Sequence, residues 1–108
     1  MEIVNCTPHP ISLDTQEGRS TFLTSGIIPR VETIETQAKA IDGFPTVSQK
    51  TGQVQGLPEM VEGTFLIVSL MVFNASDRAD LLAPDTGKSC VRDAQGHIQA
   101  VTQFIRRV

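Results

Sequence analysis

The side chains best suited to chemistry lie within and just after the longest apolar run of the sequence, residues 64–73. If residues 64–68 form a strand and Ser69 caps a short helix, the first backbone N–H groups of that helix form a positive end that can receive a phosphate. Arg78 follows soon after and offers the planar pair of donors that phosphate oxygens accept. Asp80 lies two residues further on and can accept hydrogen bonds from a ligand. These residue types predict a site for a small phosphorylated ligand.

Three further residues are candidates for the same ligand. Arg30 and Arg92 can supply additional guanidinium contacts to phosphate oxygens. His9 lies between Pro8 and Pro10, and the second proline disfavours helical backbone at His9. The imidazole is therefore expected on a stiff extended turn, either as a ligand contact or as a solvated side chain in a hairpin connection.

Other kinds of site find less support in the sequence. The candidate metal ligands are Cys6, His9, Cys90 and His97. Their separations match none of the paired spacings of zinc sites, so we expect no metal. Residues 87–89, Gly-Lys-Ser, lack the upstream glycine of a phosphate-binding loop of the nucleotide-hydrolysing type. Arg78 lies between Asp77 and Asp80, which favours charge neutralisation over the tuning of one carboxyl into a general acid.

The composition indicates one small domain, residues 1–108, rich in strands. A chain of 108 residues is long enough to bury a core but too short for two ordinary domains. It contains five Phe and no Trp or Tyr, so the core must be built from Val, Ile and Leu, and the β-branched members of that set favour strands.

Charge and hydropathy exclude several classes of partner. The net charge is −3, and the longest basic run is Arg106-Arg107, which argues against binding to long nucleic acid. The apolar run has about half the length that a membrane span requires. The first residues lack the basic and apolar regions of a signal peptide, so we expect a cytoplasmic protein whose cysteines are reduced.

The pattern predicts an α+β fold, with a mostly antiparallel sheet of about six or seven strands and one short helix. Residues 64–68 are the best strand, continuous in apolar residues as for a strand covered on both faces. The helix follows over residues 70–75, and one long strand through Phe73 is the alternative. Residues 31–40 favour a strand because of their β-branched content, with a helix over residues 32–41 as the alternative.

Three hairpins are expected. They pair residues 2–6 with 11–13 through the proline turn, residues 46–50 with 53–55 across Thr51-Gly52, and residues 89–93 with 97–106 around 94–96. The last strand carries apolar groups on both faces, so we expect it to be internal or covered by a partner chain.

Several segments, taken together and in this order, resemble a family of short proteins that is common in phage and prophage genomes. The segments are Asn5-x-Thr7-Pro8-His9-Pro10, Gly52-x-Val54-x-Gly56-Leu57-Pro58, Gly63-Thr64-x-x-Ile67-Val68-Ser69, Arg78-x-Asp80-Leu81, Pro84-x-Thr86-Gly87 and Val91-Arg92. The resemblance covers nearly the whole chain. Small phage proteins of this size include those that blunt bacterial immune signalling by sequestering cyclic oligonucleotides or cyclic ADP-ribose derivatives, usually as symmetric oligomers.

The resemblance implies a homo-oligomeric anti-defence protein in the host cytoplasm that binds a small cyclic nucleotide without cleaving it. On that expectation no cofactor is needed, and the arginines bind phosphate while Asp80 binds a ribose hydroxyl or a base edge. The expected ligand-binding residues are Thr7, His9, Ser69, Arg78, Asp80, Thr86 and Arg92. Two alternatives remain: a small hydrolase that uses His9 with Asp80, and a phage structural or interaction module without a small ligand.

Overall fold

The structure, a computed structural model, describes residues 1–87 and 90–107. In chain order the elements are β1 (Glu2–Asn5), β2 (Ile11–Thr15), β3 (Gly18–Phe22), β4 (Arg30–Ile41), β5 (Phe44–Gln55), β6 (Thr64–Ile67), α1 (Leu70–Ala75), β7 (Leu81–Pro84), β8 (Val91–Arg92), β9 (Ile98–Ala100) and β10 (Phe104–Arg106). The α+β class and the single short helix are confirmed. The described residues form ten strands, more than the six or seven expected.

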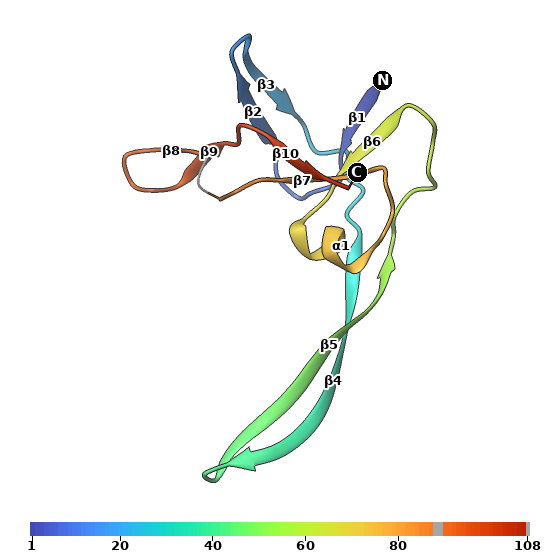
Figure 1. Cartoon of the computed structure of the whole chain (residues 1–108), viewed down its shortest axis with the longest axis vertical. Coiled ribbons are helices and arrows are strands. Elements are labelled where there is room, and N and C mark those ends of the chain that lie inside the picture. The colour runs from blue at the N-terminus through green and yellow to red at the C-terminus, as the bar shows by residue number, and fades with distance from the viewer. Residues whose placement is uncertain (88–89, 108) are drawn as a thin grey trace.

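A mixed four-stranded sheet is the centre of the molecule (Figure 1). Its order is β1-β6-β7-β10, with β6 parallel to both β1 and β7 and with β10 antiparallel to β7. The remaining strands form three two-stranded antiparallel hairpins, β2–β3, β4–β5 and β8–β9. Most pairings are therefore antiparallel, as predicted, while the central strand has parallel neighbours on both sides.

The core lies between the central sheet and α1. It contains Leu66, Val68 and Leu81 from the sheet region and Val72 and Phe73 from the helix, all buried. The continuous apolar run predicted for residues 64–68 fits this position, because the successive residues Leu66, Ile67 and Val68 are all buried and both faces of the chain are therefore covered here. The strand, the helix after it and the absence of one long strand through Phe73 are confirmed.

The β4–β5 hairpin, residues 30–55, projects from this body and is called the arm below (Figure 1). Asp42 and Gly43 form its turn with φ angles of 49° and 79°, the left-handed pair that two-residue hairpin loops of type I′ require. The arm stretches the molecule to 56 Å along its longest axis, and the radius of gyration is 16.9 Å, against about 13 Å for a compact chain of this length.

Several sequence predictions were wrong in the pairing of strands. Residues 46–50 and 53–55 do not form a hairpin, because both lie in β5 and pair with β4. β1 does not pair with β2, because β1 joins β6 in the central sheet and β2 pairs with β3.

Other predicted pairings held in part. Residues 31–40 form a strand and not a helix. A final hairpin exists as β8–β9, although Ser89, its predicted first residue, lies outside the described residues. The last strand is broken into β9 and β10, and β10 lies at the edge of the sheet, so an internal position is wrong. Among the residues that the structure describes, no helix has the length and apolar character that crossing a membrane would demand.

Candidate functional site

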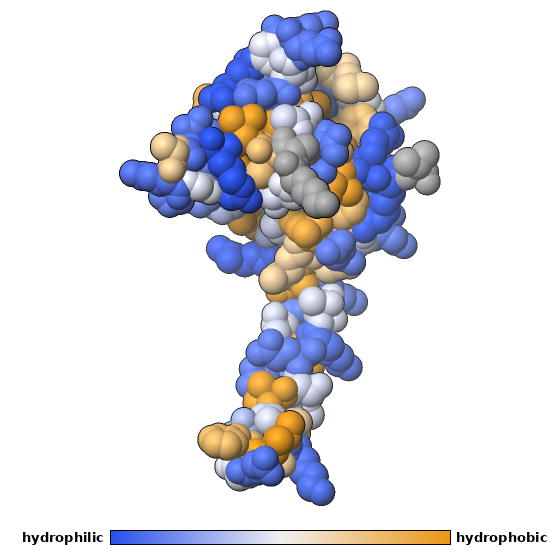
Figure 2. Space-filling model, turned by 60° about the vertical axis from the view of Figure 1, so that its left-hand side comes forward, coloured by the Kyte–Doolittle hydropathy of each residue, from blue (hydrophilic) through white to orange (hydrophobic). Residues whose placement is uncertain are grey.

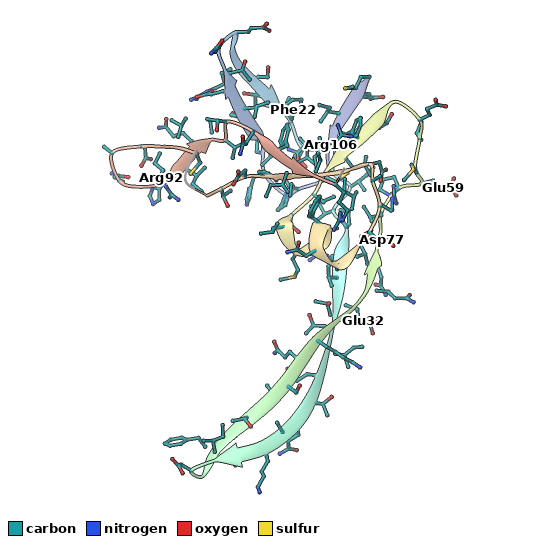
Figure 3. All side chains as sticks on the ribbon, in the orientation of Figure 1. Phe22, Glu32, Glu59, Asp77, Arg92 and Arg106 are labelled. Atoms are coloured by element: carbon teal, nitrogen blue, oxygen red, sulfur yellow. The ribbon has the colours of Figure 1, made fainter. Side chains whose placement is uncertain are left out.

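The predicted ligand-binding residues do not converge on one cavity. Arg78 lines a groove at the base of the arm, Asp80 lines a hollow beside β6 and β10, and Thr86 lines a small cavity of about 160 Å³ beside β2 and β9. Thr7, His9, Ser69 and Arg92 line none of these three. Figure 3 shows Arg92 on the β8–β9 hairpin, far across the molecule from Asp77 in the groove. The groove at the base of the arm therefore contains only one of the predicted residues, Arg78.

Thr7 and His9 belong to a hydrogen-bonded turn that is organised by Asn5, whose side chain is 2% exposed. Asn5 Nδ2 donates to the carbonyl oxygens of His9 and Phe22 at 2.9 and 2.8 Å. Its Oδ1 accepts from the Thr7 backbone N–H at 2.9 Å, and the Thr7 hydroxyl lies 2.6 Å from that oxygen and 2.9 Å from the His9 carbonyl. The first motif of the sequence thus has a structural explanation: Asn5 and Thr7 hold the turn closed, and the His9 side chain points out as an exposed group.

Ser69 is the N-cap of α1, as predicted. Its hydroxyl accepts from the Val72 N–H at 3.3 Å, and its carbonyl oxygen accepts from the Phe73 N–H at 2.9 Å. The helix has six residues only. The Ser69 hydroxyl therefore already takes up one of the free N–H groups at the helix start that the sequence assigned to a phosphate.

Arg78, which lines the groove, forms a bidentate ion pair with Asp80. Arg78 Nε donates to Asp80 Oδ1 at 3.0 Å, and Nη2 donates to Oδ2 at 2.6 Å. Arg78 Nη1 also donates to the carbonyl oxygen of Pro58 at 2.8 Å, which ties the segment after β5 to the loop after α1. The hydrogen bonds to Asp80 raise the pKa of the Arg78 guanidinium above its usual value, so Arg78 stays charged.

The groove beside Arg78 has a volume of about 910 Å³ and is shallow and wide open to solvent. The base of the arm forms one wall, the end of α1 and the loop after it form the other, and Arg107 lies between them. The lining residues are Gly52, Gln53, Val54, Gly56, Leu57, Asn74, Ala75, Ser76, Asp77, Arg78 and Arg107. The charge of Arg78 is balanced by Asp80, so the groove has no net excess of positive charge, and Arg107 is the arginine of its lining that has no ion pair among the described residues.

Arg107 is the residue of the groove that the sequence did not single out. Its guanidinium carbon lies 3.9 Å above the centre of the Phe73 ring, and Nη2 donates to the Phe73 carbonyl oxygen. Nη1 is buried, and no acceptor for it exists among the described residues. Buried donors are almost always paired in native proteins, because an unpaired one loses its hydration without compensation. Arg107 Nη1 is therefore a donor in need of an acceptor.

Nothing in the sequence marked Arg107 for this role. In the sequence it forms a short basic run with Arg106, but the structure gives the two side chains different surroundings. Arg106 is exposed, lies over the Phe65 ring at 5.2 Å, and lines the hollow that also contains Asp80 and not the groove. Only the placement of β10 beside β7 brings the chain end to the carbonyl end of α1.

Thr86 and Arg92 have local roles. Arg92 Nη1 donates to the Gly96 carbonyl oxygen at 2.8 Å and closes the β8–β9 hairpin. Thr86 shares its cavity with Pro10 and Ile11. Lys88 and Ser89, the centre of the phosphate-loop comparison, lie outside the described residues. Arg30 begins β4 and is exposed at the root of the arm.

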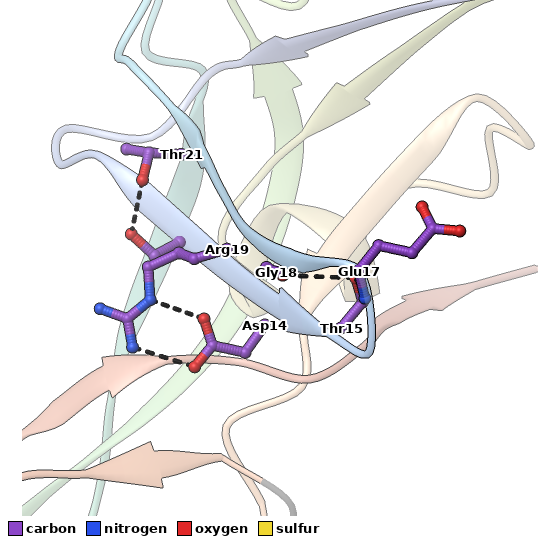
Figure 4. A network of polar contacts seen from close by, with 7 residues as sticks. Asp14, Thr15, Glu17, Gly18, Arg19 and Thr21 are labelled. Atoms are coloured by element: carbon purple, nitrogen blue, oxygen red, sulfur yellow. Dashed lines mark hydrogen bonds and ion pairs between the residues drawn. The ribbon is translucent and has the colours of Figure 1, made fainter.

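The β2–β3 hairpin carries a further polar network (Figure 4). Arg19 Nε and Nη2 donate to the two carboxylate oxygens of Asp14 at 2.6 and 2.9 Å, and the hydroxyls of Ser12 and Thr21 lie 3.1 Å apart. The hydrogen bond from Arg19 lowers the pKa of Asp14. All these groups pair across the two strands, so the network fixes the register of the hairpin and leaves little for a ligand.

Two findings bear on catalysis and metals. The described residues contain no group of three or more His, Cys, Asp or Glu side chains arranged to hold a metal ion. Asp80, the base required by the hydrolase alternative, has both carboxylate oxygens bonded to Arg78. Its side chain is 8% exposed, so a water molecule has little access to it.

Comparison with known proteins gave no match to any family model, curated protein or solved structure.

Proposed function

We propose that this protein binds a small phosphate-bearing ligand in the groove at the base of the arm and leaves the ligand intact. The observation that carries the proposal is Arg107 Nη1, a buried cationic donor with no acceptor among the described residues. A phosphate oxygen is a suitable acceptor once a small shift of the Arg107 side chain exposes Nη1 to the groove, because hydrogen bonds between a guanidinium and an anionic oxygen are short and strong.

Arg78 adds to the same surface. The described contacts of its Nη1 and Nη2 use one hydrogen on each nitrogen, and each nitrogen carries two. Because Asp80 and Pro58 fix the guanidinium, ligand binding would cost little side-chain entropy. A guanidinium held in place on the wall of a groove suits recognition of an anion better than a mobile lysine would.

A small cyclic nucleotide is the ligand class that we propose. The resemblance to short phage proteins supports it, and the open groove has room for a ligand of that size. Val54 and Leu57 give the arm side of the groove an apolar surface against which a base can pack, while Arg78 and Arg107 serve the phosphates. On this proposal the phage-type protein lowers the free concentration of an immune signal by sequestering it.

Binding without cleavage is supported by the state of the candidate base. Both carboxylate oxygens of Asp80 accept hydrogen bonds from Arg78, and the side chain is 8% exposed, so neither oxygen is placed to take a proton from a water molecule. The hydrolase alternative makes the opposite prediction: the ligand recovered from the protein would be altered, and His9→Ala would abolish the alteration.

Isothermal titration calorimetry against cyclic dinucleotides, cyclic trinucleotides, cyclic ADP-ribose isomers and inorganic phosphate tests the proposal. We expect heat of binding with at least one cyclic nucleotide, and mass spectrometry of the ligand released by denaturation should show it unchanged. The absence of binding to every nucleotide at micromolar protein would contradict the proposal.

The matched variants are Arg107→Gln and Arg106→Gln, which remove one positive charge from adjacent residues. Loss of a buried charged hydrogen bond should weaken binding by about tenfold to a hundredfold in Arg107→Gln. Arg106→Gln should bind within about twofold of the unmodified protein, because Arg106 lies outside the groove. Equal effects of the two variants would indicate general attraction of charge and not a site.

A further inference from the structure

The arm gives this protein far more surface than its mass requires. The chain exposes 7744 Å², about 1,800 Å² more than the roughly 5,900 Å² expected for a compact monomer of 11.7 kDa. Every residue of the two strands of the arm is exposed or only partly buried. A two-stranded hairpin on its own is marginally stable in water. The excess is comparable to the area that each subunit buries in a permanent homodimer, about 1,000–2,500 Å².

The two faces of the distal arm differ in character. Residues that pair across the strands share a face, and successive residues alternate between faces. One face, here called the smooth face, carries Ile34, Thr36, Ala38, Ile41, Phe44, Thr46 and Ser48, with Lys50 as its one charged residue. The opposite face carries Thr33, Glu35, Gln37, Val47, Gln49 and Thr51, and there Gln49 donates to Glu35 at 3.3 Å.

The smooth face ends in the most exposed large apolar groups of the arm. Phe44 is 71% exposed and Ile41 is 66% exposed, and Figure 2 shows apolar surface at the far end of the arm. Small side chains between Ile34 and this end allow another sheet to approach closely. Such a face resembles one inner face of a two-layer sheet packing from which the second layer has been removed.

We propose that the second layer is the arm of another copy of this chain, packed smooth face to smooth face about a twofold axis. The arm contains three basic and three acidic residues, so it carries no net charge, whereas the whole chain carries −3. Two neutral arms meet without the repulsion that two acidic bodies would feel. A twofold interface requires a self-complementary surface, and a row of small, uncharged side chains with an apolar end satisfies that requirement.

Sedimentation equilibrium and light scattering without ligand test this inference, using Thr36→Arg and Gln37→Arg. The two residues are adjacent and exposed, but Thr36 lies in the middle of the smooth face and Gln37 on the opposite face. In the proposed packing Thr36 lies near the twofold axis. Thr36→Arg therefore brings one arginine from each copy together, and self-association should weaken by at least about tenfold. Gln37→Arg should leave it within about twofold. A monomer at all concentrations, or equal effects of both variants, would overturn the proposal and assign the arm to a different partner.

Cysteine cross-linking gives a second readout that survives if Thr36→Arg fails to fold. In a Cys90→Ser background, where Cys6 is buried, Thr36→Cys should form a disulfide-linked dimer under mild oxidation and Gln37→Cys should not. Cross-linking of Gln37→Cys alone would place the interface on the wrong face and refute the smooth-face packing. Because neither measurement involves a nucleotide, the inference stands or falls independently of ligand binding.

Discussion

The arm and the body of this protein solve the problem of strand stability in different ways. The strands of the central sheet have three or four residues, yet Ile67, Val68 and Leu81 are completely buried. The strands of the arm have twelve residues each and bury none of them. Strand length is therefore a poor guide to where the free energy of folding comes from. Burial of apolar area stabilises the body, whereas the arm has its backbone ladder and a short apolar anchor at its root.

That anchor fixes the orientation of the arm relative to the body. Val31, Val54 and Leu57 are partly buried against the core cluster, where the arm meets α1. Beyond this point cross-strand pairs provide the stabilisation, each contributing about 0.2–1 kcal/mol. The contrast predicts that mutations should have large effects in the body and small effects in the distal arm of the isolated chain.

The largest effect should come from the body. Leu81→Ala removes a fully buried side chain from the core and should lower the free energy of unfolding by about 3 kcal/mol. Val47→Ala, on the arm face opposite the smooth face, should change the free energy of unfolding by less than about 0.5 kcal/mol. Urea unfolding at low protein concentration measures both. A large effect of Val47→Ala would mean that the arm is packed against something even in the monomer.

The next effect concerns Asn5, which is polar but belongs to the body. Asn5→Ala removes the partner of the Thr7 backbone N–H and of two carbonyl oxygens, and should destabilise the protein by about 2–3 kcal/mol. Asn74→Ala, at an exposed position of α1, is the matched control and should change stability by less than about 0.5 kcal/mol. Thermal unfolding compares the two, and similar melting temperatures would show that the turn is not held by the Asn5 side chain.

The sequence predicted features that depend on neighbouring residues and missed those that depend on distant ones. Ser69 and α1 follow from a cap beside a short apolar stretch, and β8–β9 follows from a turn sequence between two apolar segments. The parallel pairing of β1 with β6 joins Glu2 to Thr64, and nothing in either segment indicates the other.

The arm shows how a local signal can mislead. Thr51-Gly52 has the composition of a hairpin turn, but Gly52 lies at an irregularity of β5, where an added Cβ atom would come within 2.9 Å of the Glu32 carboxylate. That contact is with the exposed Glu32 side chain and not with the backbone of β4, and Asp42-Gly43 supplies the turn of the hairpin. Likewise, the sequence-based prediction of the site missed Arg107, because the burial of its guanidinium depends on contact with Phe73 of α1, thirty-four residues away.

Shortening the arm should have a smaller effect on stability than either substitution in the body. Replacing residues 36–48 by Asn-Gly joins Glu35 to Gln49, which already face each other across the strands, through a two-residue turn. The free energy of unfolding should change by less than about 1 kcal/mol, and self-association should be lost. Circular dichroism and light scattering measure the two properties. Loss of folding on shortening would show that the distal arm stabilises the body and would end the contrast between them.

The smallest effect should come from Asp85, at the boundary between β7 and the loop after it. Gln103 Nε2 donates to Asp85 Oδ2 at 2.7 Å and the Gly87 N–H donates to Oδ1 at 3.1 Å, and these bonds lower the pKa of Asp85 below its usual value of 3.8. Since the folded state holds the proton less tightly than the unfolded state, the carboxylate stabilises the fold above about pH 4, and this contribution disappears as the pH falls through the lowered pKa. The melting temperature of Asp85→Asn should therefore lie slightly below that of the unmodified protein at pH 7, and the difference should vanish in acid. A difference that stays constant with pH would mean that the shape of the side chain, and not its charge, holds β7 to β10.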